Sequence, residues 1–79
     1  MDGIVQAQLV VRAFWDADAK VWIAESEDIP GLIMEHPSFD ALMEDLPELA
    51  SILLEANGRP ELKSLPIHVL ADRIERASA

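Results

Sequence analysis

Residues 21–32, Val-Trp-Ile-Ala-Glu-Ser-Glu-Asp-Ile-Pro-Gly-Leu, decide the fold of this 79-residue chain. The β-branched and aromatic side chains of Val21–Ser26 predict a strand. The acidic segment Glu27–Gly31 predicts a turn, because its proline fixes φ and its glycine tolerates a positive φ. A short third strand, Leu32–Glu35, is expected to follow.

Upstream, the stretch Ile4–Trp15 has mostly apolar side chains at odd positions and glutamine or arginine at several even ones. This period of two predicts a half-buried strand. Val10 and Phe14 interrupt the polar face, so we expect another strand, a helix or a second subunit to cover that face. The polar segment Asp16–Lys20 predicts a hairpin turn between the first two strands.

Downstream, Ser38 is expected to cap a helix that ends at about Ala56, where Asn57-Gly58 supplies a left-handed residue. Pro47 lies inside the helical pattern, and an interior proline removes one backbone hydrogen bond, so a kink or break is expected near Leu46. The apolar stripe predicted to face the sheet has a spacing of three and four residues: Phe39, Leu42, Leu46, Leu49, Leu53 and Ala56.

The segment Leu65–Ala77 fits both a strand and a helix, because its apolar residues satisfy both periods. We favour a strand, since Pro66 precedes β-branched Ile67 and Val69 and since a three-stranded antiparallel meander gains stability from a further member. The expected architecture is one α+β domain over residues 1–79, in the order β-β-β-α-β.

Composition narrows the class of function. Six basic against fifteen acidic residues give a net charge of −9, which argues against direct binding of nucleic acid. The sequence holds no cysteine, so disulfides and thiolate metal sites are excluded. The absence of a long apolar run argues against a membrane segment, and a cytoplasmic protein is expected.

Catalytic and metal-binding patterns are weak. His36 and His68 are far apart in sequence, and nothing in their spacing brings them together with carboxylates. No nucleophile motif surrounds a serine, and the glycines are too dispersed to hold a phosphate. We therefore expect no enzymatic activity, no metal and no cofactor.

The strand–hairpin–strand pattern with Trp15-Asp16, then Trp22-x-Ala24, then Asp28-Ile29-Pro30-Gly31-Leu32 and a helix opened by Ser38 resembles the HicB-like antitoxin domain. The resemblance covers roughly residues 4–57 and is strongest to a short, uncharacterised subgroup without the DNA-binding domain. It implies a truncated ribonuclease-H-like fold without an active site. It also implies a role in neutralising a small RNA-cleaving toxin.

The resulting hypothesis is an interaction domain whose acidic surface masks a small basic toxin. The residues expected to bind this partner are the acidic and loop residues around the second strand: Asp16, Asp18, Glu25, Glu27, Asp28, Ile29, Pro30, Gly31 and Leu32. The alternative is a stand-alone homodimer or larger oligomer that binds another protein or a small ligand. A divalent-metal nuclease using the hairpin carboxylates is a third hypothesis, which the acidic surface opposes.

Overall fold

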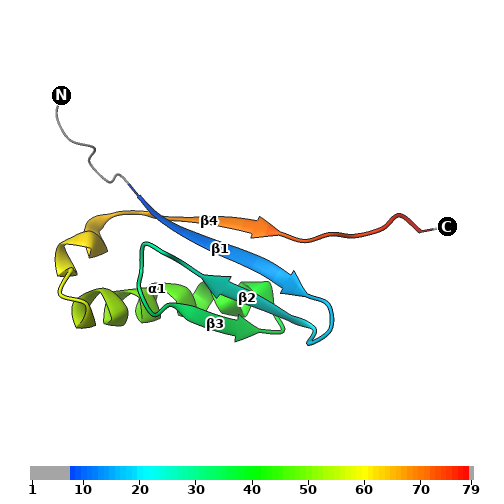
Figure 1. Ribbon diagram of the computed structural model, residues 1–79, viewed down its shortest axis with the longest axis horizontal. Helices are drawn as coiled ribbons and strands as arrows, with labels where there is room; N and C mark the ends of the chain where they lie inside the picture. Colours follow the sequence, from blue (N-terminus) through cyan, green and yellow to red (C-terminus); the bar gives the residue numbers. More distant parts are fainter. Residues whose placement is uncertain (1–7, 79) are drawn as a thin grey trace, which may run out of the picture.

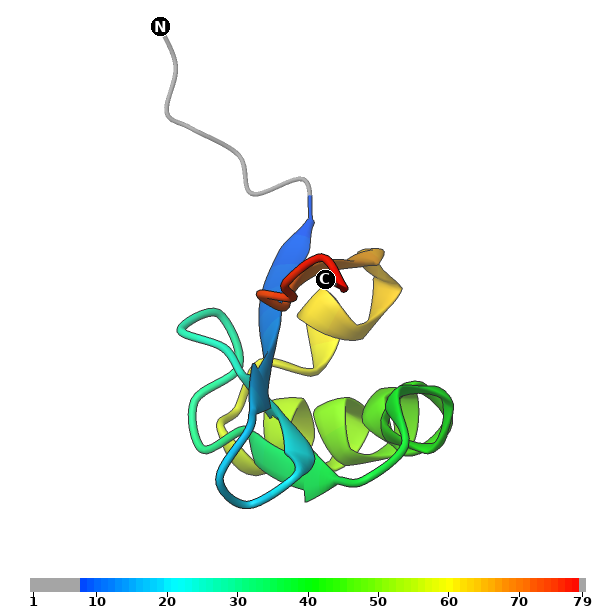
Figure 2. The ribbon, with the colours of Figure 1, turned by 90° about the vertical axis from the view of Figure 1, so that its right-hand side faces the viewer.

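The computed structural model describes residues 8–78, which form a four-stranded sheet with one long helix packed on one face (Figures 1 and 2). In chain order the elements are β1 (Leu9–Asp16), β2 (Val21–Glu25), β3 (Ile33–His36), α1 (Phe39–Ala56), the 3-10 helix η1 (Pro60–Ser64) and β4 (Ile67–Asp72). The expected α+β class is confirmed. Residues 4–7, the start of the first expected strand, lie outside the described residues.

The sheet is mixed, with the strand order β3-β2-β1-β4. β1 pairs antiparallel with β2, and β2 pairs antiparallel with β3. β4 instead lies parallel to β1, with Ile67 opposite Leu9. The antiparallel expectation thus holds for three strands and not for the sheet as a whole. Parallel neighbours need a long crossover connection, and α1 followed by η1 provides it. In Figure 2 both helices lie on the same side of β1.

The choice of a strand for the last segment is confirmed, although the strand is shorter than the expected Leu65–Ala77. β4 ends at Asp72, and residues 73–78 have no regular structure. The last pair with β1 is Phe14 opposite Asp72. β1 continues for two more residues, Trp15 and Asp16, which pair with β2, before the hairpin turn begins. The connection between α1 and β4 contains η1.

Helix α1 begins as expected, because the Ser38 side chain accepts a hydrogen bond from the Ala41 amide (3.2 Å). A kink or break was expected near Leu46; α1 does not break, since it runs without interruption from Phe39 to Ala56 with Pro47 inside it, and the kink stays a prediction. Pro47 is exposed. The buried side chains before and after it hold the two halves on the same sheet.

The carboxyl end of α1 closes at a glycine. Gly58 has φ +71°, its amide donates to the Glu55 carbonyl (3.0 Å), and the next amide, of Arg59, donates to the Leu54 carbonyl (2.8 Å). These two bonds satisfy carbonyls that the last turn leaves unpaired. The expected end at Ala56 is confirmed.

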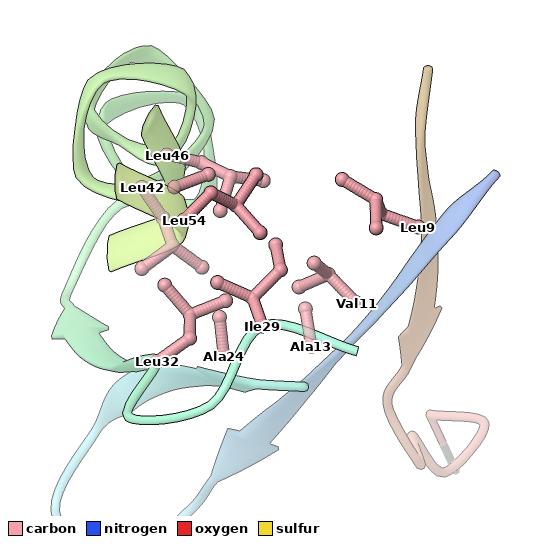
Figure 3. Close-up of a cluster of buried hydrophobic side chains, with 10 residues drawn as sticks. Leu9, Val11, Ala13, Ala24, Ile29, Leu32, Leu42, Leu46 and Leu54 are labelled. Carbon is pink, nitrogen blue, oxygen red and sulfur yellow. The ribbon is translucent and has the colours of Figure 1, made fainter. Parts of the chain in front are cut away.

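The core lies between α1 and the face of the sheet that it covers (Figure 3). Its ten buried side chains are Leu9, Val11, Ala13, Ala24, Ile29, Leu32, Leu42, Leu46, Ala50 and Leu54. The buried stripe of α1 therefore follows a spacing of four residues, and the expected stripe is only partly correct. Phe39, Leu49 and Leu53 pack against the edge of this core, while Ala56 is exposed.

Candidate functional site

The loop between β2 and β3, residues 26–32, is fastened to β1 by side-chain hydrogen bonds. The pairing of β1 with β2 ends where Arg12 faces Glu25, which leaves the Val10 backbone without a partner on β2. Asp28 Oδ2 accepts from the Val10 amide (2.7 Å), and Ser26 Oγ donates to the Val10 carbonyl (2.6 Å). The two side chains thus extend the pairing edge of β1 into the loop.

Ser26 also organises the loop itself. Its Oγ accepts from the amides of Asp28 (3.0 Å) and Ile29 (3.3 Å). Hydroxyl side chains that bond the backbone two and three residues ahead stabilise turns. One serine therefore joins the loop to the strand and sets the turn that begins the loop.

The inner half of the loop belongs to the core. Ile29 and Leu32 are buried, and their side chains lie between the sheet and α1 (Figure 3). Gly31 has φ +89° and approaches the side chain of Leu53 on α1. Asn57, at the end of α1, donates from Nδ2 to the Pro30 carbonyl (3.1 Å). The loop is thus held by β1 on one side and by α1 on the other.

We call the face of the sheet that α1 does not cover the open face. A surface hollow of about 670 Å³ lies where the loop meets this face. We call it the loop hollow, and its lining residues are Val10, Arg12, Glu25, Ser26, Glu27, Asp28, Gly31, Leu32 and Ile33. Three carboxylates and one guanidinium contribute to it. The side chains of Glu25 and Glu27 are exposed, whereas Asp28 is half-buried by its bond to the Val10 amide. A concave surface with this excess of negative charge suits a cationic group of a partner.

The structure divides the expected partner-binding residues into two groups. Asp16 ends β1 and Asp18 lies in the turn that follows, whereas the acidic residues from Glu25 to Asp28 lie at the other end of β2. Five extended residues separate the two groups by about 15 Å. Asp16 is engaged in its own turn, where Oδ1 accepts from the amides of Asp18 and Ala19. The loop hollow therefore contains the second group only.

The structure also divides the four expected loop residues, Ile29, Pro30, Gly31 and Leu32, into a buried pair and an exposed pair. The side chains of Ile29 and Leu32 face the core, while Pro30 and Gly31 are exposed at the tip of the loop. A partner that binds this loop would therefore contact its tip and the acidic residues that precede the tip.

Arg12 is a residue of the hollow that the sequence analysis did not single out. It lies in the middle of β1 on the face away from α1, directly opposite Glu25. Two features of the sequence could have indicated the place of Arg12. It has an even position in β1, and the hairpin turn pairs β1 with β2. The roles of Ser26 and Asn57 in holding the loop were also missed, because the residues to which they fasten it, Val10 and Pro30, are distant in sequence.

The two histidines lie apart in the structure. His36 Nδ1, at the end of β3, accepts from the Ser38 amide (3.1 Å), and His68 is exposed on β4. Across residues 8–78, no three His, Asp or Glu side chains gather in a way that could hold a metal ion. Over the same residues, no helix has the length and apolar character needed to cross a membrane.

Comparison with known proteins adds a family. Residues 8–79 match the family described as "Domain of unknown function (DUF1902)". Among solved structures, the chain is similar to a hypothetical protein from the extremely thermophilic bacterium Thermus thermophilus, with 35% sequence identity and a TM-score of 0.68. The match covers 91% of this chain and 99% of that protein. No curated protein matches.

Proposed function

The chain belongs to the DUF1902 family of domains of unknown function, and we propose that it is a non-enzymatic protein-interaction domain that binds and masks a small basic protein. In this proposal the domain is a HicB-like antitoxin of the cytoplasm, and its target is an RNA-cleaving toxin. The Asp28–Leu32 segment and the position of α1 between β3 and β4 support a HicB-like, truncated ribonuclease-H-like fold.

The observation that carries the proposal is the loop hollow. Glu25 and Glu27 present exposed carboxylates there, on a loop whose position is fixed by Ser26, Asp28 and Asn57. A fixed loop loses little conformational freedom when a partner binds. The net charge of −9 also accelerates encounter with a basic protein.

The mechanism of masking is steric and electrostatic. Glu25 and Glu27 would pair with Lys or Arg side chains that the partner otherwise uses to hold RNA phosphates. Pro30 and Gly31 would form the rest of the contact at the tip of the loop. In this mechanism Ile29 and Leu32 hold the loop in place from the core, and Asp16 and Asp28 retain their bonds to backbone amides.

The test is affinity purification of the tagged full-length chain from extract of its native cell at low salt, with identification of retained proteins by mass spectrometry. The expected partner is a small basic protein that cleaves RNA once released. A double variant, Glu25→Lys with Glu27→Lys, should lose it. The matched control, Glu44→Lys with Glu48→Lys on the exposed side of α1, should retain it. Equal retention by both variants would exclude the loop hollow as the contact.

The second candidate function is a stand-alone oligomeric module without a toxin. The observation that favours it is the face of the sheet opposite α1, which carries exposed apolar side chains, among them Ile33 on β3 and Leu70 on β4. Recovery of only this chain in the affinity purification would favour the module. Light scattering that shows a monomer at micromolar concentration would exclude it.

A further inference from the structure

Four side chains on the open face of the sheet form a square across β1 and β4. Arg12 lies opposite Leu70, and Phe14 lies opposite Asp72. Within each strand the two members are two residues apart and therefore point to the same face. Together with Ala13, Ala71 and Glu25, these residues line a second hollow of about 470 Å³. We call this set the β1–β4 square: Arg12, Phe14, Leu70 and Asp72.

The β1–β4 square has its two charges on one diagonal and its two apolar side chains on the other. Arg12 and Asp72 are both exposed, and neither forms an ion pair within residues 8–78. Leu70 is 48% exposed, which is high for a leucine in a sheet. The square therefore combines an unpaired cation, an unpaired anion and an apolar strip.

We propose that this face binds a second copy of the chain through a twofold axis that runs along the Leu70–Phe14 diagonal. Such an axis places Leu70 on Leu70 and Phe14 on Phe14 of the second copy. It also places each Arg12 on the Asp72 of the other copy, so both charges find partners. The inference rests on the self-association of the second candidate function and names its surface.

The dimensions of the sheet give the packing angle. Strands lie about 4.8 Å apart and two residues advance about 6.6 Å, so the diagonal is inclined about 35° to the strands. A twofold axis along it crosses the two sheets at about 70°, near the orthogonal class of sheet packing.

Charge favours this surface over the helix side for a second copy. Helix α1 carries five acidic residues, Asp40, Glu44, Asp45, Glu48 and Glu55, and no basic one. Two such surfaces would repel each other. The β1–β4 square has one charge of each sign, arranged so that a twofold axis pairs them, and one further carboxylate, Glu25, lies beside it. It therefore brings two acidic chains together with less repulsion than two α1 surfaces would.

The test is sedimentation velocity on the full chain at micromolar concentration with two charge-reversal variants, Arg12→Glu and Asp72→Arg. Wild type is expected to be a dimer. Each variant alone juxtaposes like charges at both pairs and should weaken the dimer about tenfold or more. An equimolar mixture of the two variants should regain the wild-type Kd, because each charge then meets its opposite on the other chain. Mixing would not restore the dimer if a substitution had instead unfolded the chain that carries it.

Matched controls locate the effect. Glu48→Arg on α1 makes the same charge change as Asp72→Arg and should leave the Kd unchanged. Leu70→Ser should weaken the dimer, whereas Ile52→Ser, at a comparably exposed position of α1, should not. A monomeric wild type, single variants that dimerise normally, or a mixture that stays monomeric would each overturn the inference. Retention of the basic partner in the affinity purification is a separate readout, so failure of the dimer surface is distinguishable from failure of the masking function.

Discussion

The two faces of the sheet differ residue by residue along a single strand. On β1, Leu9, Val11 and Ala13 are buried beneath α1, whereas Val10, Arg12 and Phe14 on the other face remain partly or fully accessible. The covered face accounts for the stability of the domain. The open face carries both hollows and the unpaired charges. The comparison teaches that α1 and the loop residues Ile29 and Leu32 cover one face of the sheet only, and that the opposite face is left accessible for recognition.

The largest expected difference is between two isoleucines four residues apart. Ile29 is fully buried in the core and Ile33 is 72% exposed on the open face. Ile29→Ala should lower the free energy of unfolding by about 2–5 kcal/mol, because it leaves a cavity. Ile33→Ala should change it by less than about 0.5 kcal/mol. Urea unfolding at one fixed protein concentration measures both, since self-association makes stability concentration-dependent. Equal losses would mean that the open face is also part of the core.

Two adjacent valines on β1 allow the two faces to be compared with the same substitution of the same side chain. Val11→Ala removes two buried carbons and should cost about 2–3 kcal/mol. Val10→Ala, on the open face, should cost less than about 1 kcal/mol, because Val10 is bonded to the loop through its backbone and not its side chain. The measurement is again urea unfolding. A cost for Val10→Ala that matches that of Val11→Ala would show that the open face is packed in solution.

The sequence predicted this two-faced strand well, because alternation is a local signal. The period of two in β1, the cap at Ser38 and the glycine at the end of α1 each depend on residues within a few positions of one another. The sequence also drew attention to Val10 and Phe14 as apolar residues on the polar face. Both lie on the open face of the sheet.

The parts that were missed depend on distant partners. Nothing near Ile67 indicates that its strand runs parallel to β1, because that pairing joins residues 58 positions apart. Local geometry at Pro47 suggested a kink or break, and the helix does not break there, because burial of Leu46 and Ala50 against the sheet keeps α1 continuous. Asp16 and Asp18 were grouped with Glu25 because they are close in sequence, and an extended strand separates them.

The role of Ser26 provides a test of the boundary between the two faces. Its hydroxyl takes part in three hydrogen bonds that hold the loop on β1. Ser26→Ala should lower the free energy of unfolding by about 1–3 kcal/mol, since it leaves the half-buried Val10 carbonyl and two amides without this partner. Ser78→Ala, at an exposed position, is the control. The same variant should weaken binding of a basic partner, because Glu27 is no longer held in position. Unchanged stability would mean that the backbone alone fixes the loop.

The smallest expected effect concerns the end of the covered face, where an aromatic cluster closes the core. Trp22 makes edge-to-face contacts with Trp15 (5.7 Å between ring centroids) and Phe39 (5.0 Å). The guanidinium of Arg73 lies 4.2 Å from the centre of the Trp15 ring. Arg73→Ala should lower the free energy of unfolding by about 0.5–1 kcal/mol, the value for a partly exposed cation over an aromatic ring. It should also change the tryptophan emission spectrum of the folded chain.

Two control variants separate this contact from ordinary surface charge. Arg73 also pairs with Glu75, and an exposed pair of this kind contributes little. Glu75→Ala should therefore leave both the stability and the emission spectrum nearly unchanged, and so should Arg76→Ala, which removes an exposed cation three residues away. If Glu75→Ala reproduces the effect of Arg73→Ala, the ion pair with Glu75 is what holds the Arg73 guanidinium over the Trp15 ring. In that case raised salt should weaken the ring contact as well.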